Sequence, residues 1–481
     1  MYIRFFLYLC RLNMCKSVDT YYFLGIGGIG ISALARYFAS EGYRVMGYDR
    51  TPSDLTHALE DEGIAIQYED DTAWVETLDK DTTLVVRTPA VPTSTAIYCY
   101  LQEHGFVMRK RAEVLGMITR QKKALCVAGT HGKTTTSTIL SHILHPSHVG
   151  ANAFLGGIAN NYHTNLLLDA QSDYVVVEAD EFDRSFHHLT PHISVITSMD
   201  PDHLDIYGTE EAYRESFAHY ASLVQEALVV KRDIASRLSP LTSPPHRFYT
   251  YAVGEQADFY ADNIRVEEGQ IFFDFHTPNT PYPISNIRLG VPVWVNIENS
   301  VAAMAVAWLV GATEEELRQG VSTFAGVYRR FNIHVNTPQV TYIDDYAHHP
   351  QELAATIESV RRLYPDRYVI GVFQPHLFSR TRDFADDFAR VLSQLDEVAL
   401  MPIYPAREEP IAGVTSEWLM EKIGEKVKRA LVLPAILPKY LRERLKSCLA
   451  EGKTVVVITM GAGDIDRQVN EITQKLTYKI L

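Results

Sequence analysis

The sequence predicts a multidomain α/β protein, and three observations support that fold class. Short apolar runs, such as Thr20–Leu24 and the β-branched Ile193–Thr197, alternate with helical patterns. This alternation is typical of parallel sheets covered by helices. Several of the runs lead directly into small-residue or glycine turns, as parallel βα units require. The length of 481 residues corresponds to about three domains at ~150 residues each.

Composition excludes several classes of protein. Hydrophobic residues make up 46% of the chain and charged residues 22%, which is ordinary for globular domains and excludes disordered and fibrous proteins. The formal net charge of −14 argues against a protein that coats nucleic acid, because such affinity comes from a basic surface that neutralises phosphates. A nucleotide site remains compatible with this charge, since a few local cations and backbone amides suffice for it.

Cysteine usage and the N-terminus predict a cytoplasmic protein. The five cysteines are scattered and show no CxxC spacing, which indicates reduced thiols. Residues 1–16 are apolar but short, are interrupted by Arg4 and Arg11, and lack a signal-peptide cleavage site. We interpret them as an extension before the first strand, or as a start assigned too early, with Met14 as another candidate. No later stretch is long and apolar enough to span a membrane, so no membrane partner is expected.

The first α/β unit contains a glycine turn. The expected strand Thr20–Leu24 runs into GIGGIGISALARYFASEGYRVMGYD, which reads as a turn, a helix and a second strand. Gly25, Gly27 and Gly30 fit the GxGxxG spacing, and Asp49 ends the second strand where a ribose-binding carboxylate would lie. Spacing alone indicates NAD. A nucleotide sugar would use the same turn, because its glycines let any phosphate approach the helix N-terminus, and so would a tight contact between helix and strand without a ligand.

The second unit carries the sharpest motif, a phosphate loop with the sequence GTHGKTTT. An apolar strand, a small-residue loop, Gly-Lys-Thr and a helix follow one another from Lys122. Lys133 would reach the terminal phosphates, and the hydroxyl of Thr134 would hold Mg²⁺. The general GxxxxGK[ST] pattern requires glycine where this chain has Val127, so that pattern is not met. A phosphate site is still favoured over a chance Gly-Lys-Thr, because strand, loop and helix are in register.

Acidic residues follow the next apolar strand, DYVVVE. Glu178 ends this strand, and an acid opposite a phosphate loop is typical of Mg²⁺ binding in nucleotide-hydrolysing enzymes. The acids that come next, Asp180, Glu181 and Asp183, belong either to the site or to a solvated loop. Further buried parallel strands are expected at residues 193–197 and 227–230.

A histidine lies among carboxylates after the strand at residues 193–197. His203 stands between Asp202 and Asp205 in SMDPDHLDIYG. A lone histidine is usually structural, but one among carboxylates at the carboxyl end of an α/β strand is a better candidate for a ligand.

A composition break at residues 311–334 precedes a third α/β block. Arg329 and Arg330 lie there in a loop, either as a cation clamp at a domain hinge or as surface charge. The strands of the third block are expected at residues 368–373, 398–401 and 454–459, and the last of them runs into the glycine turn MGAGDI.

Two further clusters in the third block combine groups suited to chemistry. Residues 344–350, DDYAHHP, place two acids, a tyrosine and two histidines together, which is unusual for a plain turn. In FQPHLFSRTRDF, Arg380 and Arg382 would hold a carboxylate or a phosphate in a bidentate manner. Surface arginines near a helix N-terminus explain the same residues about equally well.

Taken in order, these motifs resemble the Mur ligases of peptidoglycan synthesis. The resemblance covers residues from about 20 to 465, and its specificity comes from the joint order and spacing of the motifs. They are GIGGIGISALA, RAEVLG, GTHGKTTT, EADE, MDPDHLD, NIENSVAA, FAGVYRRF, DDYAHHP, FQPHLFSRTRD and GAGDI.

The resemblance implies a three-domain architecture. After the extension 1–16, a Rossmann-like domain at 17–117 would bind the UDP-sugar and a central P-loop ATPase-like domain at 118–325 would bind ATP. A Rossmann-like domain at 326–481 would admit the amino acid. The first glycine motif would then serve UDP and not NAD.

The resemblance also implies a set of site residues. For the UDP-sugar these are Gly27, Gly28, Ile29, Gly30, Asp49 and Arg111. For ATP they are Gly129, Thr130, His131, Gly132, Lys133, Thr134 and Thr135, with Asn296, Arg329 and Asp345 closing around the nucleotide. Thr134, Glu178 and His203 would hold Mg²⁺, and His348 and Arg380 would contact L-alanine.

The implied reaction is the ATP-dependent ligation of L-alanine to the lactyl carboxylate of UDP-N-acetylmuramate through an acyl phosphate, by a monomer or homodimer. A recycling ligase that attaches a preformed murein peptide is the close alternative. A nicotinamide dehydrogenase leaves GTHGKTTT unexplained, and a non-catalytic ATP-binding switch would not need the clusters of the third block. Two features differ within the family: Val295 stands where histidine is usual, and the lysine that some sister ligases carry after PDHLD is absent.

Overall fold

The computed structural model describes residues 18–201, 204–238, 247–267, 269–406 and 408–477. The chain forms two compact units. Unit 1 comprises Met1–Tyr260, His276–Pro283 and Asn299–Val321, and unit 2 comprises Ala261–Phe275, Ile284–Glu298 and Ser322–Leu481. Among the described residues, no helix has the length and apolar character needed to cross a membrane.

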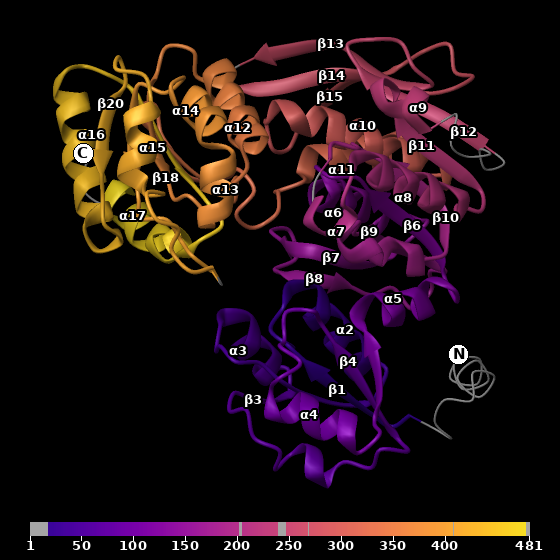
Figure 1. Cartoon of the computed structure of the whole chain (residues 1–481). Helices are drawn as coiled ribbons and strands as arrows, with labels where there is room; N and C mark the ends of the chain where they lie inside the picture. Colours follow the sequence, from indigo (N-terminus) through magenta and orange to yellow (C-terminus); the bar gives the residue numbers. More distant parts are fainter. Residues whose placement is uncertain (1–17, 202–203, 239–246, 268, 407, 478–481) are drawn as a thin grey trace. The chain divides into compact units, whose positions relative to one another are not determined.

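A five-stranded parallel sheet opens unit 1, with the strand order β3-β2-β1-β4-β5 (Figure 1). All five residues of β1 are buried, because this strand lies between two neighbours and under helices. The prediction of a strand at Thr20–Leu24 is confirmed. The strands are β1 Thr20–Leu24, β2 Arg44–Tyr48, β3 Ala65–Gln67, β4 Thr83–Arg87 and β5 Val107–Lys110, and the helices are α2 Ile29–Ser40, α3 Asp54–Asp61, α4 Ala96–Glu103 and α5 Arg111–Thr119.

Seven strands of a second, ten-stranded sheet lie in unit 1, in the order β12-β11-β10-β6-β9-β7-β8. All adjacent pairs are parallel except β7 and β8, so the predicted parallel strands are confirmed, whereas the antiparallel edge was not foreseen. Its strands are β6 Lys123–Ala128, β7 Asn152–Ala159, β8 Thr164–Leu167, β9 Tyr174–Ala179, β10 Pro191–Ile196, β11 Ala227–Lys231 and β12 Arg247–Val253. The helices in this part are α6 Lys133–Leu144, α7 Leu204–Tyr207, α8 Glu210–Ser222, α9 Arg232–Leu238 and, further along the chain, α11 Glu314–Thr323.

This strand order brings three loops to one edge. Strands β9, β6 and β10 are neighbours and run parallel, so the segments that follow them leave the sheet on the same side. Ligands of open α/β sheets bind outside the carboxyl ends of such strands. The phosphate loop after β6, the acidic residues after β9 and the segment after β10 therefore meet there.

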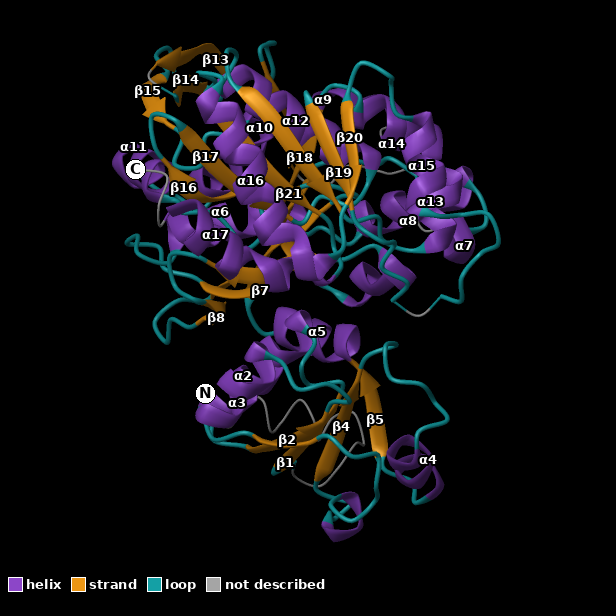
Figure 2. Ribbon diagram, turned by 90° about the vertical axis from the view of Figure 1, so that its left-hand side faces the viewer, coloured by secondary structure: helices purple, strands orange, loops and turns teal. Residues whose placement is uncertain are grey.

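Unit 2 is built on a six-stranded sheet with the order β16-β17-β21-β18-β19-β20 (Figure 2). Only β16 is antiparallel to its neighbour. The predicted strand at 368–373 coincides with β18, and those at 398–401 and 454–459 are shifted by one residue. The strands are β16 Asn332–Asn336, β17 Val340–Asp345, β18 Tyr368–Phe373, β19 Glu397–Leu400, β20 Lys428–Leu431 and β21 Val455–Met460, and the helices are α12 Pro350–Leu363, α13 Phe378–Asp383, α14 Ala385–Leu392, α15 Ser416–Lys422, α16 Leu437–Ala450 and α17 Val469–Thr477.

In the segment that precedes this sheet, the chain alternates between the two units. Strands β13 Phe259–Glu267, β14 Gln270–His276 and β15 Ile284–Arg288 follow β12, and β14 pairs with β15 antiparallel. Helix α10, Trp294–Leu309, has a run of completely buried residues from Val301 to Ala307. The exact residue ranges of the three domains stay a prediction.

Candidate active site

Two glycines shape the loop between β6 and α6. Gly129 has a φ of 135°, and a Cβ atom there would lie 2.1 Å from the Thr197 hydroxyl oxygen. Gly132 has a φ of 81° at the N-cap of α6, and a Cβ atom there would lie 2.7 Å from Asn299 Oδ1. An L side chain would be strained at both positions. The loop therefore keeps its backbone N–H groups at the helix N-terminus, where phosphates bind.

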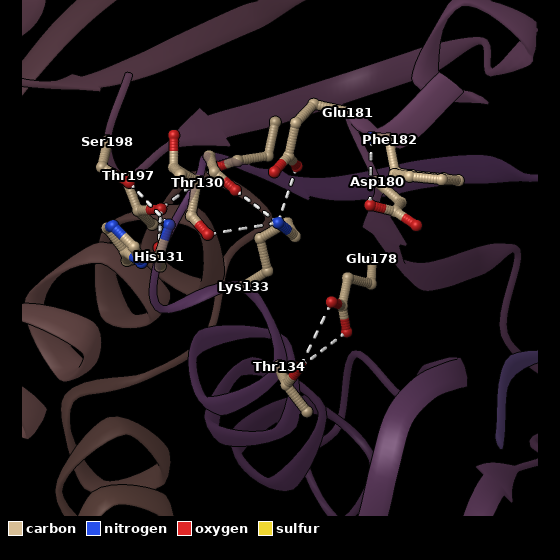
Figure 3. Close-up of polar contacts among 12 residues, drawn as sticks. Thr130, His131, Lys133, Thr134, Glu178, Asp180, Glu181, Phe182, Thr197 and Ser198 are labelled. Carbon is tan, nitrogen blue, oxygen red and sulfur yellow. Dashed lines mark hydrogen bonds and ion pairs between the residues drawn. The ribbon is translucent and has the colours of Figure 1, made fainter. Parts of the chain in front are cut away.

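Side chains from the segment after β10 hold this loop in place. The Thr197 hydroxyl donates to the His131 carbonyl at 2.5 Å, and the His131 N–H donates to Ser198 Oγ at 2.8 Å (Figure 3). The Thr130 hydroxyl donates to the Asp200 carbonyl at 2.8 Å. The loop conformation is thus supported by hydrogen bonds from the neighbouring segment.

Lys133 begins α6 and lies within the loop that precedes it. Its ammonium donates to the Gly129 carbonyl at 2.7 Å and to Glu181 Oε2 at 2.6 Å (Figure 3). The Lys133 side chain is 13% exposed and that of Glu181 2%. Burial opposes the charge on Lys133, but the carboxylates of Glu181, Asp180 and Glu178 outweigh it and raise the lysine pKa. The alternative that Glu181 belongs to a solvated loop is therefore wrong.

Thr134 and Glu178 form an oxygen pair beside the loop. The Thr134 hydroxyl donates to the Glu178 carboxylate at 3.0 Å and 3.2 Å. The carboxylate fits against β7 only because residue 156 is glycine, since a Cβ atom there would lie 1.9 Å from Glu178 Oε2. Hydroxyl and carboxylate oxygens are the donors that Mg²⁺ prefers, so this pair fits that ion.

Of the other residues predicted for this region, the structure describes some and leaves one outside the described residues. His203, the third expected metal ligand, lies outside the described residues. Within the described part of the chain, no three His, Cys, Asp or Glu residues are grouped closely enough to form a metal site by themselves. Thr135 lies in the first turn of α6. The next residue, Thr136, donates its hydroxyl proton to Asn299 Oδ1 at 3.2 Å.

The first glycine turn binds a carboxylate of its own chain. The Gly27 N–H donates to Asp49 Oδ2 at 2.8 Å, and the Thr51 N–H donates to Oδ1 at 3.1 Å. Gly28 is the N-cap of α2, and Ile29 is its first residue. The loop therefore offers a helix N-terminus next to an anchored carboxylate.

Arg111 links this turn to the acidic residues after β9. Its guanidinium lies so close to Gly30 that a Cβ atom there would be 2.8 Å from Nη1. Its Nη2 lies 3.8 Å from Asp180 Oδ2, and Lys110 Nζ lies 2.7 Å from Asp183 Oδ2. Arg111 thus lies between the glycine turn and the acidic residues after β9, and Lys110 pairs with the same acidic run.

Three residues predicted to contact the nucleotide lie in unit 2. Arg329 has a φ of 61°, is buried, and donates to the Gly461 carbonyl at 2.6 Å. Its guanidinium lies 3.4 Å from both Asp344 and Asp466, so it is not a surface charge. Asn296 is also buried and donates to the Val291 carbonyl at 3.3 Å.

The third of these residues, Asp345, ends β17. It accepts the Thr356 hydroxyl at 2.6 Å and the Ala347 N–H at 3.1 Å. Burial raises the pKa of its carboxyl to about 6. Each carboxylate oxygen is therefore already paired within unit 2.

His348 and Arg380 are brought together around a histidine that the sequence did not single out. The His348 ring centroid lies 5.9 Å from that of His376, and Arg380 Nη1 lies 3.4 Å from His376 Nδ1. Burial, His348 and Arg380 lower the pKa of His376 to about 4, and burial also lowers that of His348. Both imidazoles are therefore uncharged near neutral pH. Arg382, by contrast, is exposed and pairs with Asp383.

Several of these residues were missed because their signal is tertiary. Glu181 lies in an acidic run, and nothing in that run shows which member is buried. Gly156 lies in no quoted motif and acts through a residue on another element. Asn299 and His376 both lie in quoted motifs, and His376 could have been found by its spacing from Arg380.

Family models match three consecutive parts of the chain. The model described as "Mur ligase family, catalytic domain" matches residues 20–123, and "Mur ligase middle domain" matches residues 127–307. The model described as "Mur ligase, glutamate ligase domain" matches residues 329–463.

Relatives extend over nearly the full length. The chain is 52% identical over 472 residues to a UDP-N-acetylmuramate–L-alanine ligase of Phocaeicola vulgatus, covering 97% of this chain and 100% of that protein. It is 54% identical over 471 residues to the ligase of the same name from Parabacteroides distasonis, covering 97% and 99%.

Solved structures share the fold. A UDP-N-acetylmuramate–alanine ligase from Thermotoga maritima superposes with a TM-score of 0.79 at 24% identity, covering 95% of this chain and 99% of that one. A murein peptide ligase from Psychrobacter arcticus gives 0.65 at 21% identity, covering 96% and 100%. From the three family models and the near-full-length relatives, the chain belongs to the Mur ligase family.

Proposed function

We propose that this protein is an ATP-dependent ligase that joins L-alanine to the lactyl carboxylate of UDP-N-acetylmuramate in peptidoglycan biosynthesis. The choice of substrates rests on the two relatives of that name, which are 52% and 54% identical over almost the whole chain. The observation that carries the chemistry is the glycine-shaped loop that places Lys133 beside the Thr134–Glu178 pair. The recycling ligase is not favoured, because the relatives that are more than 50% identical over nearly the full length are alanine ligases.

The reaction needs an activated carboxylate. A carboxylate at neutral pH is a poor acylating agent, so the lactyl carboxylate attacks the γ-phosphate of ATP. The bond from the γ-phosphorus to the β-phosphate oxygen breaks, ADP leaves, and an acyl phosphate is formed. Lys133 spreads the negative charge that builds on the transferred phosphoryl group. Mg²⁺, held by Thr134 and Glu178 with His203 as a further ligand, would neutralise phosphate charge when bound. Gly129 to Thr135 cradle the remaining phosphate oxygens with backbone N–H groups.

The second step forms the amide. The amine of L-alanine attacks the acyl carbon as the free base, and a tetrahedral oxyanion forms. The bond to the phosphate oxygen then breaks, and phosphate leaves with the surplus proton of the amine. Arg380 holds the amino acid carboxylate, and His348 contacts the amine with an uncharged ring, since its pKa is lowered by burial. Asn296, Arg329 and Asp345 are proposed to act on the nucleotide indirectly, by fixing the loops of unit 2 to which they are bonded.

The glycine turn after β1 is proposed to bind the UDP part of the sugar nucleotide. Gly27, Gly28, Ile29 and Gly30 present the α2 N-terminus to the pyrophosphate, and Asp49 accepts from the ribose or the turn. Arg111 lies close to Gly30 and supplies a positive charge there. A cytoplasmic location and a monomeric or homodimeric state stay predictions from the sequence.

Phosphate release tests this assignment. The purified protein is given Mg-ATP and UDP-N-acetylmuramate with L-alanine, a murein tripeptide or no acceptor, and the sugar product is weighed by mass spectrometry. We expect phosphate release that depends on L-alanine and a product heavier by one alanyl residue. Turnover with the tripeptide alone would assign the recycling reaction, and no turnover with either acceptor would contradict the ligase assignment.

A further inference from the structure

Each of the three N–H groups of the Lys133 ammonium has an acceptor within hydrogen-bonding distance. An ammonium has three N–H bonds. Its nitrogen lies 2.7 Å from the Gly129 carbonyl oxygen, 3.4 Å from that of Thr130 and 2.6 Å from Glu181 Oε2. Of these three acceptors only Glu181 is charged. A phosphate that binds Lys133 must therefore replace at least one of them, and Glu181 is the acceptor most like a phosphate oxygen.

Glu181 is held where it is by its own backbone. Its carbonyl accepts the Tyr207 hydroxyl at 2.5 Å and the Arg184 N–H at 3.0 Å. The next residues turn sharply, since Asp183 and Arg184 both have positive φ values near 50°. The carboxylate is thus attached to a fixed loop and is nearly inaccessible to water. Nucleotide binding would leave it buried beside phosphates of the same charge, which is unfavourable.

We propose that Glu181 is a positioning residue that occupies the place of the terminal phosphate in the empty site and competes with nucleotide for Lys133. This inference rests on the proposed role of Lys133 in ATP binding. Without nucleotide, Glu181 holds the ammonium of Lys133 in the loop by its hydrogen bond. When phosphates bind, the lysine is transferred from Glu181 to them. When ADP leaves, Glu181 takes the lysine back, so it weakens nucleotide affinity and favours product release.

The variant Glu181→Gln separates this role from simple support of the fold. Glutamine keeps the shape and one acceptor oxygen but removes the competing charge. We expect MgADP to bind about three- to tenfold more tightly to this variant in isothermal titration calorimetry, a factor in the range of a single ion-pair contribution. The KM for ATP should fall by a similar factor while the KM for UDP-N-acetylmuramate stays unchanged. A merely structural glutamate would not produce that split.

The control is another hydrogen-bonded glutamate of unit 1. Glu316 accepts from the His148 ring and from the Thr313 N–H and hydroxyl, none of which belongs to the site. Glu316→Gln should lower the melting temperature without changing MgADP affinity. Should Glu181→Gln fail to fold, Tyr207→Phe is the milder variant. It keeps both charges but releases the loop, and we expect a smaller tightening in the same direction.

Unchanged or weaker MgADP binding by Glu181→Gln, or by Tyr207→Phe in its place, would overturn the inference. Binding of MgADP requires neither sugar nor alanine, so the test does not depend on which amide is made. The variant Lys133→Met distinguishes the two claims. If it leaves MgADP affinity unchanged, the proposed nucleotide site itself is wrong. If it weakens affinity while Glu181→Gln does not tighten it, only the role of Glu181 is wrong.

Discussion

Two buried bases, Lys133 in the phosphate-loop site of unit 1 and His376 in the histidine cluster of unit 2, have pKa values shifted in opposite directions. The histidine cluster comprises His348, His376 and Arg380. In the phosphate-loop site, Lys133 is buried and yet its pKa is raised, because carboxylates lie around it. In unit 2, burial lowers the pKa of His376 to about 4 and raises that of Asp345 to about 6, so each group is shifted toward its neutral form. Burial acts on both sites. At Lys133 the surrounding carboxylates outweigh it, whereas at His376 and Asp345 burial decides the direction of the shift.

This difference matches what each site is proposed to bind. Phosphates and a metal ion are highly charged, and a site that keeps full charges in fixed places is suited to them. An amine that must react as its free base is better met by uncharged imidazoles, which do not repel an ammonium and can accept its hydrogen bond. Stabilisation of phosphate charge and binding of the amine are therefore assigned to residues that follow strands of two different sheets.

Removal of the lysine should have the largest effect. We expect Lys133→Met to lower kcat by about 10³-fold, because the charge on the transferred phosphoryl group loses its stabilising cation. The substitution also leaves Glu181 buried without its partner, so the melting temperature should fall. The double variant Lys133→Met, Glu181→Gln should regain most of the melting temperature and none of the activity. Recovery of activity would show that Lys133 acts through the fold alone.

The second-largest effect is expected when the proposed metal-binding pair, Thr134 and Glu178, is displaced. A methyl group at residue 156 would overlap Glu178 Oε2, so Gly156→Ala should push that carboxylate away from Thr134. We expect kcat to fall by about 10²-fold, with a higher Mg²⁺ concentration for half-maximal rate. Gly424→Ala is the matched control, since a Cβ atom there meets only Ser393 at 3.3 Å. An unchanged Mg²⁺ requirement in Gly156→Ala would separate Glu178 from the metal.

A smaller effect is expected from the histidine cluster of unit 2. Arg380→Lys keeps the positive charge but loses the planar fork that pairs with a carboxylate. We expect the KM for L-alanine to rise about tenfold while the KM for ATP is unchanged, which steady-state kinetics with each substrate varied would measure. Arg382→Lys serves as the control, because Arg382 is exposed and bonded to Asp383. A parallel rise of the KM for ATP would place Arg380 at the nucleotide instead.

The pH dependence of stability should show the smallest effect, with two opposite signs. His376 has a depressed pKa, so the folded state binds fewer protons than the unfolded state between about pH 4 and 6.5, and stability is lost as pH falls through that range. His376→Gln should therefore lose less melting temperature on acidification, by roughly 2–4 °C.

Asp345 acts in the other direction. Its raised pKa means that the folded state binds more protons than the unfolded state between about pH 4 and 6, so its contribution is present at low pH and is lost as pH rises through 6. Asp345→Asn keeps an acceptor for the Thr356 hydroxyl but cannot titrate. It should lose more melting temperature on acidification than the unmodified protein. The same acid response in both variants would refute the assigned directions.

The sequence by itself determined the fold class and most of the chemistry. Apolar runs such as Thr20–Leu24 and Tyr368–Phe373 became strands, because a segment that is buried on both faces must be apolar along its whole length. The motif GTHGKTTT could be recognised because the residues of a phosphate loop are contiguous in the chain. Local patterns of this kind are read without knowledge of distant neighbours.

Only the tertiary structure decided which charges are paired and which groups are neutral. The sequence left Glu181 as one acid of a run and Arg329 as a clamp or a surface charge, and the structure buries both against specific partners. It also placed His376 beside His348 and made Gly156 the space for Glu178. Burial and Coulomb interactions depend on what other elements bring within a few ångströms, and that information is absent from any single segment.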